Sequence, residues 1–153
     1  MIKRAAITDL IVEIFRLNGR LLVAGDALVV DVGLTSARWQ VLGAIALSPT
    51  PLPVAHISRN MGLTRQAVQR LANEMARDGL VRFMPNPHHQ RAKLVLLTAR
   101  GKAAYDAAMR RQEPWASRLA DGLSAKELEA ATSLLRTIRQ RLDDTVKQGT
   151  GDA

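Results

Sequence analysis

Residues 57–68 read ISRNMGLTRQAV, and this stretch decides the fold. Gly62 can adopt the positive φ that a tight turn between two helices requires. Thr64 follows two residues later and can cap a new helix by accepting a hydrogen bond from its free backbone N–H groups. We therefore predict a short helix over 54–60, a glycine turn, and a second helix over 65–78.

The second helix has one apolar face and one polar face. Helical periodicity gathers its apolar residues on one side: Val68, Leu71, Ala72 and Met75. The opposite side carries Gln66, Gln69, Arg70, Asn73 and Arg77. Forked Arg, Gln and Asn side chains match the base edges of guanine and adenine, whereas a merely solvated face more often carries Lys and Glu. A polar face on a lone helix can also be simply solvated, so the interpretation depends on the surrounding sequence.

A basic hairpin follows this helix directly. Gly79 ends the helix, and residues 80–84 and 93–97 predict two strands. Between them, residues 85–92 read PNPHHQRA, which is rich in turn-forming residues. Two helices joined by a glycine turn and followed by a basic hairpin form a winged helix-turn-helix.

The positive charge of the chain is concentrated in the same region. The 153 residues contain 22 Lys and Arg against 14 Asp and Glu, which gives a net charge of +8. The window 56–102 contains nine basic residues but only Glu74 and Asp78 as acids, a surplus of seven. A basic protein favours a polyanionic partner, either nucleic acid or an anionic membrane surface. The helix and the hairpin in this window favour double-stranded DNA.

The same pattern predicts which residues contact DNA. Thr64, Arg65 and Gln66 should enter the major groove, and Arg91 at the hairpin tip should reach phosphates or the adjacent minor groove. The full predicted set is Thr64, Arg65, Gln66, Gln69, Arg70, Asn73, His88, His89 and Arg91. The two histidines could suggest a metal, but without cysteine or a nearby acid the ligand set is incomplete. We expect them to contact phosphates, and we expect no metal and no cofactor.

Helices are also predicted on the N-terminal side. Apolar residues recur every three or four positions over 5–30, and Gly33 ends that helix. Thr35 can cap a helix over 36–47. Its inward residues should be Trp39, Val41, Leu42 and Ile45. The proline-rich residues 48–53 predict a loop.

On the C-terminal side, Thr98 can cap a helix over 99–118, in which Pro114 should produce a kink or a break. Ser124 and Glu127 form a capping box that begins a last helix. Its apolar residues alternate at spacings of three and four, the narrow seam by which helices pair between subunits. They are Leu128, Ala131, Leu135, Ile138 and Leu142. The polar tail 147–153 should be frayed.

Composition excludes several classes of protein. With 47% hydrophobic residues the chain can fold a core, and with no cysteine it has no thiol chemistry. Charged residues interrupt any signal peptide, and prolines interrupt the longest uncharged stretch, so we expect a soluble cytoplasmic protein with no membrane partner. An enzyme would require an activated nucleophile, a metal cluster or paired acids, and none occurs at usable spacing. An architectural or RNA-binding module without an effector remains the alternative.

Four stretches match one known family in order and spacing. They are residues 33–35 with 38–42, residues 57–68, the wing with Arg91, 95–98 and Gly101, and residues 123–128. On these residues, which extend over about 5–146, the chain resembles the multiple-antibiotic-resistance regulator (MarR) family of bacterial transcription factors. His89 stands where many members have an acid two positions before the arginine that matches Arg91. The arginine itself is present, so we expect it to keep its role in DNA binding.

The resemblance implies a single domain, 1–153. It would be a mainly α fold with a small β-hairpin wing: a winged helix-turn-helix over 34–98 and terminal helices, 5–30 and 99–147, that form a dimerisation region. It implies a homodimer on a pseudo-palindromic operator, commonly as a repressor. The dimerisation candidates are Leu10, Ile14, Leu128, Leu135, Ile138 and Leu142.

The resemblance also implies a small lipophilic, often anionic phenolic ligand, bound between the dimerisation and DNA-binding parts, that weakens DNA binding. Phe15, Trp39 and Tyr105 are candidates to line its pocket. Aromatic residues at helical spacing are more often core residues, so both interpretations of these three side chains stay open.

Overall fold

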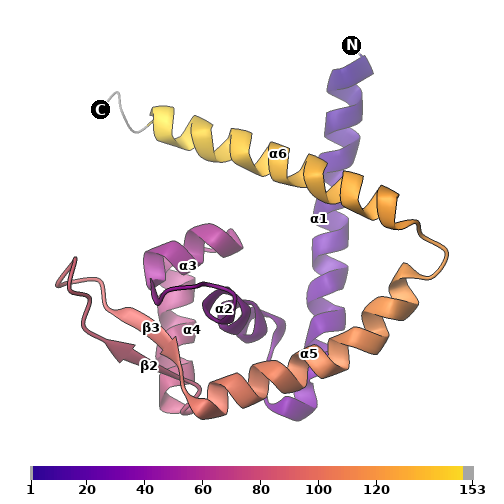
Figure 1. Ribbon diagram of the computed structural model, residues 1–153. Coiled ribbons are helices and arrows are strands. Elements are labelled where there is room, and N and C mark those ends of the chain that lie inside the picture. The colour runs from indigo at the N-terminus through magenta and orange to yellow at the C-terminus, as the bar shows by residue number, and fades with distance from the viewer. Residues whose placement is uncertain (1, 150–153) are drawn as a thin grey trace. The chain divides into compact units, whose positions relative to one another are not determined.

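The computed structural model describes residues 2–149, and most of them are helical. In chain order the elements are α1 (Ile2–Val29), a 3-10 turn (Val30–Val32), α2 (Ser36–Ala46), β1 (Leu52–Pro53), α3 (Val54–Met61), α4 (Arg65–Arg77), β2 (Val81–Met84), β3 (Leu94–Leu97), α5 (Ala99–Ala120) and α6 (Ala125–Gly149) (Figure 1). This confirms the predicted mainly α fold with a hairpin wing. Of the predicted frayed tail, residues 150–153 lie outside the described residues.

The chain separates into two compact units. The first runs to Glu113, and the second begins at Pro114. The boundary falls inside α5, which continues through Pro114 from Ala99 to Ala120. Of the predicted kink or break at Pro114, the break is therefore wrong, because the helix continues through the proline, while the kink stays a prediction. Among residues 2–149, no helix is both long and apolar enough to cross a membrane.

Threonine caps and positive-φ glycines set the ends of the predicted helices. The Thr35 hydroxyl accepts a hydrogen bond from Arg38 N at the start of α2, and the Thr64 hydroxyl accepts one from Ala67 N at 3.1 Å at the start of α4. Gly62, in the turn before Thr64, has a φ of +64°. The cap and the left-handed glycine confirm the predicted turn between the two helices.

The three strands form an antiparallel sheet in the order β1-β3-β2. Val95 of β3 pairs with Phe83 of β2 and also with Leu52 of β1. The prediction of a loop over 48–53 is therefore wrong at its last two residues. Pro53 is tolerated there because β1 is an edge strand, where a residue without a backbone N–H costs no ladder bond.

The core lies where α2, α3, α4 and the sheet meet. The apolar face of α4 is buried as predicted, and its members are Val68, Leu71, Ala72 and Met75. Val41, Leu42 and Ile45 of α2 are also buried, whereas Trp39 is only half-buried at the edge of this core. The polar face of α4 is therefore the outer one.

Candidate nucleic-acid interface

The polar face of α4 and the hairpin tip are open to solvent. All nine residues predicted to contact DNA are exposed: Thr64, Arg65, Gln66, Gln69, Arg70, Asn73, His88, His89 and Arg91. Exposure is a condition for contact with a partner and leaves each predicted role open.

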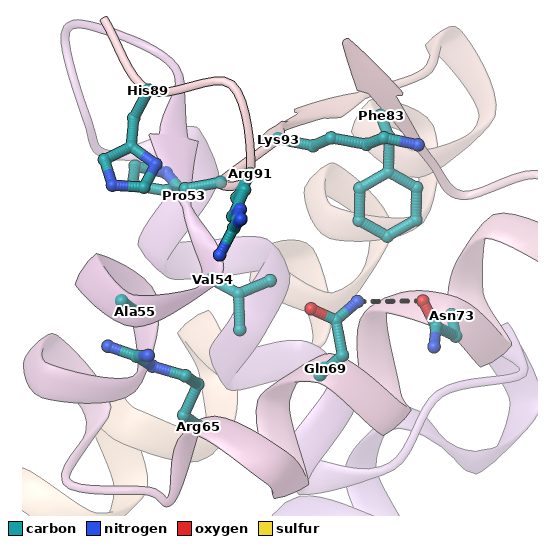
Figure 2. Close-up of a pocket in the computed structure, with 11 residues that line it drawn as sticks. Pro53, Val54, Ala55, Arg65, Gln69, Asn73, Phe83, His89, Arg91 and Lys93 are labelled. Atoms are coloured by element: carbon teal, nitrogen blue, oxygen red, sulfur yellow. Dashed lines mark hydrogen bonds between the residues drawn. The ribbon is translucent and has the colours of Figure 1, made fainter. Parts of the chain in front are cut away.

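A groove of about 580 Å³ runs between α4 and the wing. It brings together five of the nine predicted residues: Arg65, Gln69 and Asn73 from α4, and His89 and Arg91 from the hairpin (Figure 2). The other four, Thr64, Gln66, Arg70 and His88, do not line it. The helix and the wing therefore share one concave surface.

Within the groove, Gln69 Nε2 donates a hydrogen bond to Asn73 Oδ1 at 2.9 Å, which Figure 2 marks with a dashed line. The two side chains are one helical turn apart, so each holds the other's amide in a fixed orientation. Each amide still has a donor or an acceptor free for a base edge.

The groove is basic. Arg65, Arg91 and Lys93 line it, and no acidic side chain does. Among the described residues, none of these three cations makes a salt bridge with a carboxylate. Unpaired cations around a concave surface attract a polyanion over several ångströms and release counterions from it on binding.

Lys93 and Phe83 line the groove but were missed by the sequence prediction. Lys93 lies two positions after Arg91, between the turn that contains Arg91 and the start of β3. Its positive charge next to the predicted basic tip was a usable signal for Lys93. The ring of Phe83 gave no such signal, because a phenylalanine in a strand is usually assigned to the core.

The two acids of the basic window are held elsewhere by one arginine. Arg38 of α2 contacts Asp78 through Nη1 at 2.7 Å and Glu74 through Nη2 at 3.6 Å. Only 20% of the Arg38 side chain is exposed, so solvent screens this cluster less than a surface pair. The cluster joins α2 to the C-terminal end of α4, and both acids pair away from the groove.

A second pocket, of about 690 Å³, lies between α2, the end of α3 and α5. Two of the three residues predicted to contact a ligand, Trp39 and Tyr105, line it. Phe15 does not, and on α1 it is 72% exposed. A contact with a ligand stays a prediction for all three side chains.

The remaining predicted residues lie on the terminal helices. Leu128, Leu135 and Leu142 of α6 are exposed, whereas Leu10, Ile14 and Ile138 are partly exposed. Among residues 2–149 there is no group of three or more His, Cys, Asp or Glu side chains that could hold a metal.

Comparisons with known proteins find a matching family model and relatives in sequence. A model of the MarR family matches residues 32–92. An uncharacterized protein of Mycobacterium tuberculosis is 35% identical over 130 residues, 85% of this chain and 90% of the relative. The transcriptional activatory protein BadR of Rhodopseudomonas palustris is 34% identical over 77 residues, 48% of this chain and 43% of BadR.

Solved structures share the fold over most of their length. Sco5413 of Streptomyces coelicolor, a MarR family regulator, matches with a TM-score of 0.72, 29% identity, and coverage of 93% and 96% of the two chains. MosR of M. tuberculosis in complex with DNA has a TM-score of 0.71, 24% identity, and coverage of 87% and 95%. CouR of Rhodococcus jostii bound to p-coumaroyl-CoA has a TM-score of 0.73, 24% identity, and coverage of 81% and 87%.

Proposed function

This chain belongs to the MarR family of transcriptional regulators, and on that premise we propose that it is a homodimeric repressor that binds a pseudo-palindromic operator and is released by a small lipophilic ligand. The family and the fold are those of transcription regulators, and neither indicates an enzyme. The proposed DNA contacts are those of α4 and the wing.

The basic groove between α4 and the wing is the observation that carries this proposal. It combines phosphate-binding cations, Arg91 and Lys93, with amide side chains, Gln69 and Asn73, that suit base edges. The solved complex of MosR with DNA supports the same use of this fold. In each subunit α4 occupies the major groove, and the two half-sites lie about one helical turn, roughly 10 base pairs, apart.

The alternative is a constitutive DNA-binding or architectural winged-helix protein without an effector. The 690 Å³ pocket beside Trp39 and Tyr105 favours the ligand-responsive proposal, because its size falls in the range of small-molecule sites. The p-coumaroyl-CoA bound to CouR shows that a relative in fold takes a ligand. Binding of a ligand that leaves DNA affinity unchanged would favour the alternative.

The DNA contacts are tested by separating phosphate binding from base reading. Genomic DNA fragments that bind to the protein supply an operator sequence. Fluorescence anisotropy then compares the affinity for this operator with the affinity for a random duplex. We expect Arg91→Ala to weaken binding to both duplexes and to lower the salt slope by about 1. We expect Gln66→Ala or Arg65→Ala to reduce discrimination by about 1–3 kcal/mol at particular base pairs.

Arg110→Ala is the matched control, because Arg110 is an exposed arginine of α5 outside the groove. It should leave both affinities unchanged. An equal loss on operator and random DNA for Arg65, Gln66 and Arg91 variants alike would count against base reading by α4. No preference for any genomic fragment over random DNA would overturn the proposal as a whole.

A further inference from the structure

Among the residues that the structure describes, no charged side chain lines the pocket beside Trp39 and Tyr105. Its lining comes from α2, the loop after α2, the end of α3, and α5. Most of the wall is apolar, and its polar groups belong to Gln40, Ser48 and Asn60 and to the Tyr105 hydroxyl and the Trp39 indole N–H. In a chain with 22 Lys and Arg residues, whose α4–wing groove is lined by four basic side chains counting His89, this lack of charge distinguishes the pocket from the nucleic-acid surface.

The polar groups of the wall are neutral, and one of them is already engaged. The Ser48 hydroxyl donates to Thr50 O at 2.6 Å and accepts from Thr50 N at 3.4 Å. The amides of Gln40 and Asn60 remain to bind a polar substituent. Neutral amides can hydrogen-bond a hydroxyl, carbonyl or amide group, but they do not balance the charge of a carboxylate withdrawn from water.

Gly43 keeps the space beside one of the rings open. It lies in the middle of α2, where glycine is an unfavourable helix residue. A Cβ at this position would stand 3.4 Å from Tyr105 Cε2, at the short end of van der Waals contact, so a side chain here would fill the space beside the ring and narrow the pocket. Trp39 and Tyr105 offer flat faces, and Met61 and Met109 offer polarizable sulfur.

We infer that this pocket binds an uncharged, planar aromatic molecule and disfavours the corresponding carboxylate. This differs from the anionic phenolic ligands that the family resemblance implies, and the difference follows from the wall of this chain. The inference rests on the proposed function in one respect: it treats the pocket as the effector site of a ligand-released regulator.

A matched pair of probes tests the charge preference on the full-length protein. 2-Naphthamide and 2-naphthoate have the same ring system, but only the second is an anion at pH 7. Calorimetry should show that the amide binds at least about tenfold more tightly than the carboxylate. The neutral wall does not compensate for the free-energy cost of removing the carboxylate from water. Equal affinity, tighter binding of the carboxylate, or no binding of the amide would each overturn the inference.

Fluorescence shows where the amide binds. The chain has two tryptophans, Trp39 and Trp115, so Trp115→Phe leaves Trp39 as the single reporter. Naphthamide should change the emission of this variant with the affinity measured by calorimetry. Binding by calorimetry without any change in Trp39 emission places the amide elsewhere and overturns the inference.

Two variants alter the wall itself. Gly43→Ala should weaken naphthamide severalfold while the protein stays folded, since alanine favours the helix. Gly19→Ala in α1 makes the same change where no atom lies within 4 Å, and should bind naphthamide like the wild type.

Leu47, 79% exposed at the end of α2, accepts a cation readily: Leu47→Lys should raise naphthoate affinity about tenfold, whereas Leu47→Met should not. Failure of Leu47→Lys to improve naphthoate binding would contradict charge as the discriminating factor.

A DNA titration with and without naphthamide separates this inference from the proposed function. If the amide binds and leaves operator affinity unchanged, the ligand class stands and the effector role in the proposed function fails. If the protein binds its operator and does not bind the amide, the DNA-binding function stands and this inference fails.

Discussion

At the scale of single residues, Gly101 lies directly against the backbone of Leu80. It is buried in the first turn of α5, and a Cβ there would overlap the carbonyl oxygen of Leu80. Thr98 Oγ1 accepts a hydrogen bond from Gly101 N at 3.0 Å and donates one to Gly79 O at 2.6 Å. Thr98 and Gly101 therefore join the start of α5 to the residues between α4 and β2.

Gly101→Ala tests how much this junction contributes to stability. The clash is with backbone, which moves less easily than a side chain, so we expect a loss of about 2 kcal/mol or more in the free energy of unfolding. For a chain of this size, each kcal/mol corresponds to about 2–4 °C in Tm. Thermal denaturation followed by circular dichroism measures it. Gly19→Ala, with open space around it, should not lower Tm; a wild-type Tm for Gly101→Ala would show that α5 adjusts freely.

At the scale of elements, the sequence alone predicted those features that depend on residues close together in the chain. Thr35 and Thr64 cap helices whose first turns follow them directly, so their roles were predictable. The strand β1 was not predictable, because Leu52 pairs with Val95, more than forty residues away. The sequence around Leu52 is rich in proline, which predicts a loop. The same limit applies to Ser36, whose N–H donates to Asp26 Oδ1 at 2.6 Å.

The residues of the candidate site likewise divide into those that the sequence predicted and those that it did not. The α4 residues were predictable because helical periodicity alone separates the inner face from the outer one. The partners that α4 meets across the groove, Lys93 and Phe83, depend on how the hairpin folds back over it. The acids Glu74 and Asp78 reduced the predicted charge of the window, yet Arg38 pairs with them away from the groove. Such pairing between distant segments does not appear in a local charge count.

The start of α6 gives a pH-dependent prediction at this scale. The Ser124 hydroxyl and backbone N–H both donate to Glu127 Oε2, at 2.8 Å and 3.2 Å, and they hold the pKa of Glu127 below its ordinary value of 4.5. Because the pKa of Glu127 is lower in the folded state than in the unfolded state, its ionised carboxylate stabilises the helix above pH 4.5. This contribution is lost as the pH falls through the folded-state pKa. Glu127→Gln should therefore lower Tm at pH 7, and the difference from wild type should vanish at acid pH.

Ser124→Ala is the companion variant for this prediction. It removes the hydroxyl that accepts from Glu127 N at 3.1 Å, a contact that does not depend on pH. Its Tm should stay below that of the wild type even in acid, unlike that of Glu127→Gln. A Glu127→Gln difference that is constant from pH 3 to pH 7 would show that the carboxylate charge plays no part.

At the scale of the whole molecule, apolar side chains remain uncovered on both terminal helices. On α6, Leu128, Leu135 and Leu142 are 43%, 42% and 63% exposed. On α1, Ile7, Ile11 and Phe15 are also exposed. Soluble monomers rarely expose apolar rows of this kind, and the α6 row has the narrow spacing by which helices pair. These rows support the proposed dimer, while the charge that serves DNA is concentrated in the other part of the chain.

Leu135→Asp tests the dimer at the centre of the α6 row. A carboxylate in a helix pair must be desolvated without a partner, so we expect this variant to sediment as a monomer at micromolar concentrations at which the wild type is a dimer. Its operator affinity should fall steeply because two half-sites are no longer bound together, while its affinity for a single half-site should be unchanged. Gln140→Asp puts the same residue on the opposite side of α6, where the side chain is exposed, and should remain dimeric. A wild-type protein that sediments as a monomer, or a Leu135→Asp variant that stays dimeric, would show that α6 does not join the subunits along this row.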